Sequence, residues 1–251
     1  MSALKVKVRK PGGILMCMPA YNQMVQACTT ESIFSTGQWL TAQGIMNQMA
    51  WFSAADIVEV RNLFLTMWYD SRPEYEWLLF IDADMGWHPA LIRDYLRFGK
   101  PLMGTFYAKR QMDPAVVGTV LNEDHSAKDI VDGFLRASDL GGGLMMINRS
   151  LVRDMLAKMP QLSDPHSWLL ASVAKPFGLT RIIRAFDPIL DESNGRVRRL
   201  SEDVSFCHRW RECGGEVWAN VDNKISHVGP FDYHLCYGAV LRRKAAEATK
   251  V

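Results

Sequence analysis

Two aspartates separated by one residue directly follow a short apolar run. Residues 78–81 are Leu-Leu-Phe-Ile, and Asp82-Ala83-Asp84 comes next. Four consecutive apolar residues are typical of a buried strand, and side chains two apart on an extended chain point the same way. Paired carboxylates at the end of a buried strand are unfavourable without partners. The pattern therefore predicts a divalent cation, Mn²⁺ or Mg²⁺, and the phosphates that it neutralises.

The alternative is an ordinary polar turn, with Asp84 close to the start of the next helix and favoured there by the helix macrodipole. Pro89 is well suited to open that helix, and Gly99 is well suited to end it. An apolar strand directly before the aspartates and a proline-opened helix after them favour the functional interpretation.

Four further polar residues, at three places in the chain, have both a chemical and a structural interpretation. Asp203 follows Ser201-Glu202, where it suits a general base, but serine at an N-cap and acids in a first turn are also ordinary helix signals. His227 suits a metal ligand, although a lone histidine is more often structural. Lys109 and its neighbour Arg110 suit a diphosphate or open solvent equally well.

Strand and helix patterns alternate over the first two-thirds of the chain, which predicts a mostly parallel sheet flanked by helices. Apolar runs predict strands at 13–18, 51–52, 78–81, 101–107, 144–147 and 214–219. Periodicity predicts helices at 23–50, 56–69, 89–98, from Ser150 and from Ser201, which we expect to cap its helix, to Cys213. Residues 111–140 suggest a hairpin insertion, and 160–200 are the least regular. Pro19, Asp82 and Lys109 all follow strand ends, where ligands of such sheets bind.

Composition is consistent with one α/β domain over residues 1–251. No stretch is apolar enough to span a bilayer, and the first residues lack a secretory h-region, so we expect a cytoplasmic protein. The five cysteines form no Cys-x-x-Cys pair, and we expect them to be reduced. Residues 1–10 and 242–251 are basic tails. Solvated ends explain them best, while a membrane surface or nucleic acid is the alternative.

The order of the motifs resembles that of GT-A-fold nucleotide-sugar glycosyltransferases, in particular their large inverting superfamily. The resemblance covers about residues 14–230. It rests on Met-Pro-Ala-Tyr-Asn at 18–22, Arg-Asn at 61–62, Leu-Phe-Ile-Asp-Ala-Asp at 79–84, Gly142-Gly143, Ser-Glu-Asp-Val at 201–204 and His-Val-Gly at 227–229. It implies a single Rossmann-like GT-A domain.

The resemblance also implies roles for individual residues. Asp82, Asp84 and His227 would hold the metal, and Asp203 would be the general base of an inverting reaction. The remaining residues would bind the nucleotide sugar: Pro19, Tyr21, Asn22, Arg61, Asp82, Ala83, Asp84, Lys109, Gly142, Gly143 and Glu202. For Arg61 the alternative is a surface cation on its helix.

The function so implied is metal-dependent transfer of a sugar from a nucleoside diphosphate sugar, with a UDP-sugar favoured, to a hydroxyl acceptor. A glycan, a lipid-linked sugar, a protein and a modified nucleic-acid base all fit as acceptor. Two alternatives stay open. A nucleotidyltransferase normally needs a Gly-rich, basic loop after strand one, where this chain has Pro-Ala-Tyr-Asn. A non-catalytic binding module would keep the pocket without turnover, and the joint presence of Asp82, Asp84, Asp203 and His227 argues against it.

Overall fold

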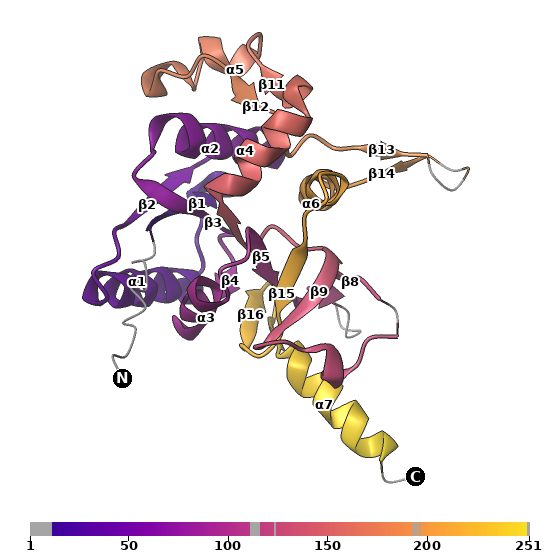
Figure 1. The fold of residues 1–251 in the computed structure, drawn as a ribbon. Coiled ribbons are helices and arrows are strands. Elements are labelled where there is room, and N and C mark those ends of the chain that lie inside the picture. Colours follow the sequence, from indigo (N-terminus) through magenta and orange to yellow (C-terminus); the bar gives the residue numbers. More distant parts are fainter. Residues whose placement is uncertain (1–11, 111–115, 123, 193–194, 196, 250–251) are drawn as a thin grey trace, which may run out of the picture.

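The architecture is α/β, built around one large sheet (Figure 1). The computed structural model describes residues 12–110, 116–122, 124–192, 195 and 197–249. The sheet has eight strands in the order β2-β1-β3-β10-β5-β15-β9-β8. Their bounds are β1 Gly13–Pro19, β2 Asn47–Phe52, β3 Tyr75–Ile81, β5 Leu102–Thr105, β8 Thr119–Val120, β9 Phe134–Asp139, β10 Leu144–Asn148 and β15 Val217–Asn220.

Six of these strands run in one direction. β1 is parallel to β2 and β3, and β15 is parallel to β5. β10 lies between β3 and β5 and is antiparallel to both, so those two strands share a direction. β9 is antiparallel to β15 and to β8. The predicted mostly parallel sheet flanked by helices is therefore confirmed, with β10 and β9 as the reversed strands.

Helices cover both faces of the sheet. They are α1 Ala27–Ala42, α2 Ile57–Ser71, α3 Ala90–Phe98, α4 Arg149–Lys158, α5 Trp168–Ala171, α6 Glu202–Glu212 and α7 Tyr237–Ala248. Alternate strand residues enter two apolar cores. Leu15 and Cys17 join the core under α2, α4 and α6, while Ile14 and Met16 join the core under α1 and α3. No helix of the described residues is long and apolar enough to cross a membrane.

Short strands complete the fold. β4 (Met85–Gly86), β16 (Ile225–Val228) and β17 (Asp232–Leu235) form a three-stranded sheet in the order β17-β16-β4. Three two-stranded pairs join β6 (Tyr107–Ala108) to β7 (Val116–Val117), β11 (Ser163–Asp164) to β12 (Ile182–Ile183) and β13 (Leu190–Asp191) to β14 (Arg198–Arg199). Because β16 pairs with β4, His227 lies beside the loop that carries the two aspartates.

The helix predicted at 23–50 is wrong at both ends. It begins at Ala27 and ends at Ala42, and Gly44 (φ 68°) then turns the chain into β2. β2 begins at Asn47, well before the predicted residue 51, because pairing with β1 outweighs the local helical pattern. Residues 111–140 are also more than an isolated hairpin, since β9 joins the central sheet.

The irregular region 160–200 is fixed to α2 by buried polar bonds. The amide of Ile183 donates to Thr66 Oγ1 (2.8 Å), and the amide of Phe186 donates to Asn62 Oδ1 (2.9 Å). Of the two basic tails, residues 1–10 lie outside the described residues. Residues 242–248 belong to α7 and are exposed, so this end is solvated as predicted but is helical through Ala248 rather than frayed.

Candidate functional site

A cavity of about 580 Å³ opens beyond the carboxyl ends of β1 and β3. Six separate parts of the chain line it, as expected where parallel strands end. The lining residues that can do chemistry are Tyr21, Arg61, Asp82, Asp84, Tyr107, Arg110, Glu202 and His227; Pro19, Met24, Gln26, Ile57, Ala83, Val117, Val228 and Gly229 complete the wall.

The loop between the two aspartates is held by its backbone. The carbonyl of Ala83 accepts from the amide of Gln26 (2.8 Å) and from Thr29 Oγ1 (3.1 Å), both at the start of α1. The amide of Asp82 donates to the carbonyl of Gly143 (2.9 Å), and the carbonyl of Asp84 accepts from the amide of Val228 (2.8 Å). Because the backbone is satisfied from three sides, both carboxylates are left to face the cavity.

Arg61 is the buried centre of the site. Its side chain is 2% exposed, and it donates from Nη2 to Asp82 Oδ1 and from Nη1 to the carbonyl of Gly142, both at 2.9 Å. Its Nε lies 3.6 Å from Glu202 Oε1. Burial lowers the pKa of Arg61, but the surrounding carboxylates, with Asp82 the strongest, outweigh it and raise the pKa. The alternative of a surface cation is therefore wrong.

Burial has the opposite consequence for the acids around Arg61. It raises the pKa of Asp82 and of Glu202, and the guanidinium of Arg61 offsets only part of that rise. Neighbouring carboxylates add to the rise, since like charges disfavour a second negative charge. The site thus concentrates negative charge around one cation, an arrangement common where a protein binds further charged groups.

Asp84 and His227 form the part of the cavity that suits a cation. Asp84 Oδ2 lies 2.9 Å from Arg110 Nη1 and 3.6 Å from His227 Nε2, while Asp84 Oδ1 is buried without a hydrogen-bond partner among the described residues. His227 Nδ1 lies 2.7 Å from the carbonyl of Ala108, which can only accept. The proton of a neutral imidazole therefore belongs on Nδ1, leaving the Nε2 lone pair facing Asp84.

These two residues fit a divalent cation as an incomplete ligand set. Asp82 forms an ion pair with Arg61. Among the described residues, no three His, Cys, Asp or Glu side chains lie close enough together to form a complete metal site. Mg²⁺ and Mn²⁺ are commonly held by only one or two protein side chains, with water and substrate phosphates supplying the rest. Asp84 and His227 would supply the protein's share.

Asp203 faces the glycine-rich turn rather than the cavity wall. Its Oδ2 accepts from the amide of Gly142 (3.2 Å), and its Oδ1 accepts from the amide of Val204 (2.8 Å) and from the hydroxyl of Ser201. The predicted Ser201 cap is wrong in detail. Ser201 occupies the N-cap position, but its side chain bonds to Asp203 and caps no backbone amide.

The glycine-rich turn packs tightly against protein side chains. A Cβ added to Gly142 would lie 1.9 Å from Arg61 Nη1, and one added to Gly141 would lie 2.2 Å from the hydroxyl of Tyr107. That hydroxyl accepts from the amide of Gly143 (3.3 Å). The small residues are therefore required by Arg61 and Tyr107.

Most predicted site residues lie together. Eight of them line the cavity: Pro19, Tyr21, Arg61, Asp82, Ala83, Asp84, Glu202 and His227. Asn22 belongs to the adjoining turn, with a φ of 54°, and does not line the cavity. Lys109 is exposed and does not line it either, whereas its neighbour Arg110 does. Three predicted residues do not line the cavity but belong to the glycine-rich turn next to Arg61 or contact it: Gly142, Gly143 and Asp203.

Tyr107 is the residue that the sequence did not single out. It is buried, it stands edge-on to His227 with ring centroids 5.0 Å apart, and burial raises its pKa. Its position at a strand end, next to Lys109 and Arg110, was the available signal.

No family model and no curated protein sequence matches this chain. Solved structures of similar shape include protein A197 from STIV, at 14% identity over 86% of both chains with a TM-score of 0.47. A glycosyltransferase involved in glycosylation of the major capsid of PBCV-1 shares 9% identity, over 65% of this chain and 77% of its own, with a TM-score of 0.34.

The 4-diphosphocytidyl-2C-methyl-D-erythritol synthase from Anaerococcus prevotii is also similar, at 9% identity over 80% of this chain and 99% of its own, with a TM-score of 0.33. None of the three reaches a TM-score of 0.5. A function therefore has to be argued from the residues of the site.

Proposed function

We propose that the protein is a metal-dependent glycosyltransferase that moves a sugar from a nucleoside diphosphate sugar to a hydroxyl acceptor. One observation carries the proposal. Asp84 lines the cavity with one buried oxygen, Oδ1, that has no hydrogen-bond partner among the described residues, and its other oxygen, Oδ2, lies near His227 Nε2 and the guanidinium of Arg110. A cation bound there would leave the diphosphate within reach of Arg110, and fixed positive groups are what a departing diphosphate needs.

The cavity suits such a donor in size and lining. Its volume of about 580 Å³ falls within the usual range of small-molecule sites. Tyr21 is largely exposed at the rim beside Pro19, so its ring is free to stack on a nucleotide base; a UDP-sugar is the favoured donor. Arg110 is half exposed and can leave Asp84 for a phosphate oxygen without a loss of buried packing.

Mn²⁺ or Mg²⁺, held by Asp84 and His227, would neutralise charge on the diphosphate. The chain's own part in the transfer is to remove the proton of the acceptor hydroxyl. Asp203 takes it from the acceptor hydroxyl as that oxygen bonds to the anomeric carbon and the bond to the diphosphate breaks, which inverts the configuration. A carboxylate has about four acceptor positions, and Gly142, Val204 and Ser201 occupy three of them. One remains for the acceptor.

The test is calorimetric titration of a panel of nucleoside diphosphate sugars, each with and without Mn²⁺. We expect one donor to bind only with metal, and Asp84→Ala to weaken that binding at least tenfold. Asp154→Ala is the matched control, because Asp154 is a half-buried acid on α4, away from the cavity, whose one ion pair in the described residues is with Arg153. Failure of every donor to bind would refute the proposal.

His227→Ala tests the second ligand, with His234→Ala as its control on the neighbouring strand. His234 is exposed and contacts Ser226 rather than Asp84. Only His227→Ala should raise the Mn²⁺ concentration needed for donor binding. Product analysis then separates the alternatives. Release of nucleoside diphosphate from the donor indicates sugar transfer, and release of pyrophosphate from a nucleoside triphosphate and a sugar phosphate, tested separately, indicates a nucleotidyltransferase. Binding without turnover of either substrate set indicates a non-catalytic module.

A further inference from the structure

β2 is an unprotected edge of the central sheet. It ends the strand order, and no described strand pairs with its outer side. Its six residues pair with β1 in an unbroken parallel register, from Ile14–Asn47 to Pro19–Phe52, without a bulge. Monomeric proteins usually protect an edge with charges, proline or a bulge. The sequence Asn-Gln-Met-Ala-Trp-Phe of β2 contains none of these.

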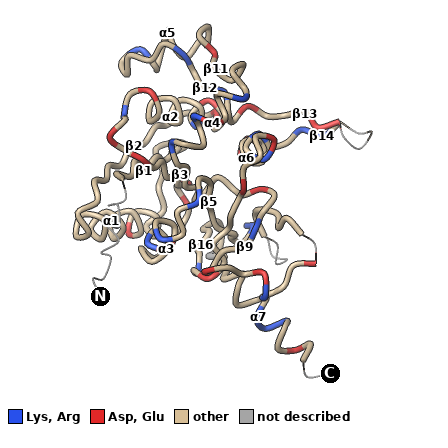
Figure 2. Tube along the Cα trace, in the orientation of Figure 1, with Lys and Arg blue, Asp and Glu red and all other residues tan. Residues whose placement is uncertain are grey.

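The chain around this edge is almost free of charge. Between Lys10 and Asp56, Glu31 is the only charged residue, although 22% of the whole chain is charged. Figure 2 shows α1 and β2 as nearly uninterrupted tan tube, in contrast to the helices elsewhere. Two such surfaces facing each other would bring few like charges together, with Glu31 on α1 and Arg72 beside the cavity next to β2 as the nearby charged residues.

Large apolar side chains are exposed along the same edge. Trp51 is 59% exposed and Phe34 65%, and Met46 is partly exposed beside the first residue of β2. Isolated apolar residues on a surface are normal, but a contiguous group usually marks an interaction site.

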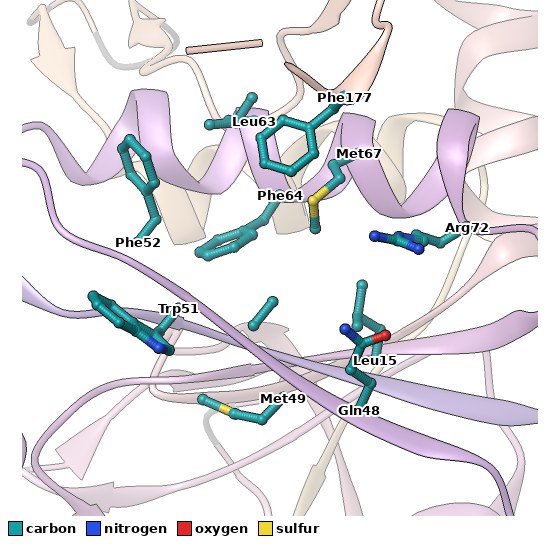
Figure 3. Close-up of a pocket in the computed structure, with 11 residues that line it drawn as sticks. Leu15, Gln48, Met49, Trp51, Phe52, Leu63, Phe64, Met67, Arg72 and Phe177 are labelled. Atoms are coloured by element: carbon teal, nitrogen blue, oxygen red, sulfur yellow. The ribbon is translucent and has the colours of Figure 1, made fainter. Parts of the chain in front are cut away.

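A cavity adjoins each face of this strand. One of about 290 Å³ lies between β2 and α2, where Figure 3 shows Phe52 beside α2 and Trp51 and Met49 farther from it. Another of about 520 Å³ lies between β2 and α1, lined by Phe34, Met49 and Trp51 among others. Side chains alternate between the two, since Ala50 and Phe52 pack against the core under α2 and Met49 packs against the core under α1.

We propose that β2 pairs antiparallel with β2 of a second copy, so that a two-fold axis at Ala50 joins the two central sheets into one. Directly opposite residues of an antiparallel pair share a face. In this register Trp51 lies opposite the partner's Met49, and the same contact recurs on the other side of the axis. Sulfur–aromatic contacts of this kind are favourable.

The strand's own sequence favours this occupant over a foreign one. A register centred on Ala50 places the exposed Trp51 opposite the partner's Met49 and Gln48 opposite the partner's Phe52, whereas one centred on Met49 places Trp51 opposite the polar Asn47 of the partner subunit. A two-fold contact must be self-complementary. Each copy of β2 is neutral and carries both Met49 and Trp51 on one face, so each copy supplies both halves of the contact and the requirement is met.

The first test is the mass of the full chain in solution by sedimentation equilibrium. We expect twice the chain mass of 28.5 kDa. Trp51→Lys should give a folded monomer, as judged by circular dichroism. Trp168→Lys is the matched control, because Trp168 is 61% exposed on α5, away from this edge, and should stay dimeric. A monomeric wild type, or a folded Trp51→Lys dimer, would overturn the proposal.

The second test does not depend on how Trp51→Lys folds. Ala50→Cys places two thiols at the axis, and copper phenanthroline should oxidise them to an intermolecular disulfide. Met46→Cys is the control, since an antiparallel pair centred on Ala50 separates its two copies by roughly 25 Å. Wild type measured in parallel accounts for the native cysteines. Equal cross-linking of Ala50→Cys and Met46→Cys would exclude this register.

Discussion

Arg61 and Asp82 form an ion pair in which the guanidinium is almost wholly enclosed while the carboxylate still reaches the cavity. The same guanidinium donates to the carbonyl of Gly142, whose amide donates to Asp203. The chain of bonds Asp82–Arg61–Gly142–Asp203 therefore joins the proposed donor-binding loop to the proposed base. Arg61 positions both without itself taking part in proton transfer.

Removal of Arg61 should destabilise the fold as well as the site. Arg61→Met leaves Asp82 and Glu202 without their buried counter-charge, and breaking a buried pair in this way typically costs about 3–5 kcal/mol. Urea unfolding would measure the loss. Arg153→Met is the control, because Arg153 pairs with Asp154 on the surface, where solvent screening leaves an ion pair little effect on stability. Equal losses in the two variants would contradict the central role of Arg61.

Gly142→Ala should damage the site by contact alone. The added methyl group would overlap the guanidinium of Arg61, and overpacking of this kind costs about 1–3 kcal/mol. Gly37→Ala is the matched control: its Cβ would meet nothing closer than 3.4 Å inside α1, so stability should rise by about 0.5–1 kcal/mol. Thermal unfolding of both variants should show a lower melting temperature for Gly142→Ala and a higher one for Gly37→Ala. A melting temperature for Gly142→Ala at or above that of wild type would contradict the described packing.

Asp203→Asn should separate binding from transfer. The side chain keeps its shape but gives up the bond from one backbone amide, because only one of its two terminal atoms can still accept. Asp203 does not line the cavity, so donor affinity should stay within about threefold, while loss of a general base lowers the transfer rate by about 10²–10⁴-fold. Calorimetry and a product assay on the same preparation measure the two effects. Asp84→Ala should instead lose donor binding. If both variants lost donor affinity equally, the roles assigned to the two acids would be wrong.

Stability should respond to the titration of Glu202. Burial raises its pKa above the ordinary value of 4.5, so the folded state holds this proton more tightly than the unfolded chain does. The favourable contribution is complete below the ordinary pKa and is lost as the pH rises through the raised one. Glu202→Gln removes this titration. Relative to wild type, the variant should therefore gain stability as the pH rises from 4.5 to neutrality.

Urea unfolding at a series of pH values measures that difference. Glu247→Gln is the control, because Glu247 is exposed on α7 and pairs only loosely with Arg243. Its stability curve should run parallel to that of wild type. A curve for Glu202→Gln that is also parallel to wild type would mean that Glu202 titrates as an ordinary exposed acid.

Local pattern was enough to predict the elements whose signals are continuous in sequence. The apolar run before Asp82 is β3, and the 3.6-residue periodicity after Asp56 is α2. The start of β2 and the reversed direction of β10 were not predictable in this way. Both depend on neighbours distant in sequence, since β2 forms on β1 and β10 is inserted between β3 and β5.

The residues of the site divide in the same way, into those predictable from local sequence and those that depend on distant neighbours. The acids, Arg61 and His227 were predictable because each belongs to a short motif. The hydroxyl of Tyr107 at the glycine turn and the partnership of Arg110 with Asp84 were not, because no spacing rule joins residues that meet only after folding. The requirement for glycine at position 142 was equally unpredictable, since it depends on where the guanidinium of Arg61 lies in the folded protein.

Two surfaces of this protein, the edge of β2 and the cavity around Asp84, should respond differently to ionic strength. The reason is the scarcity of charge between Lys10 and Asp56. Contacts along β2 involve no charged side chain of that strand, so Debye screening leaves them untouched, and salts that promote apolar burial strengthen them. The cavity presents Arg110, Asp84 and Glu202 to its ligand, and screening weakens such contacts. Added sodium sulfate should therefore favour association of the chain while it reduces affinity for a phosphate-bearing donor.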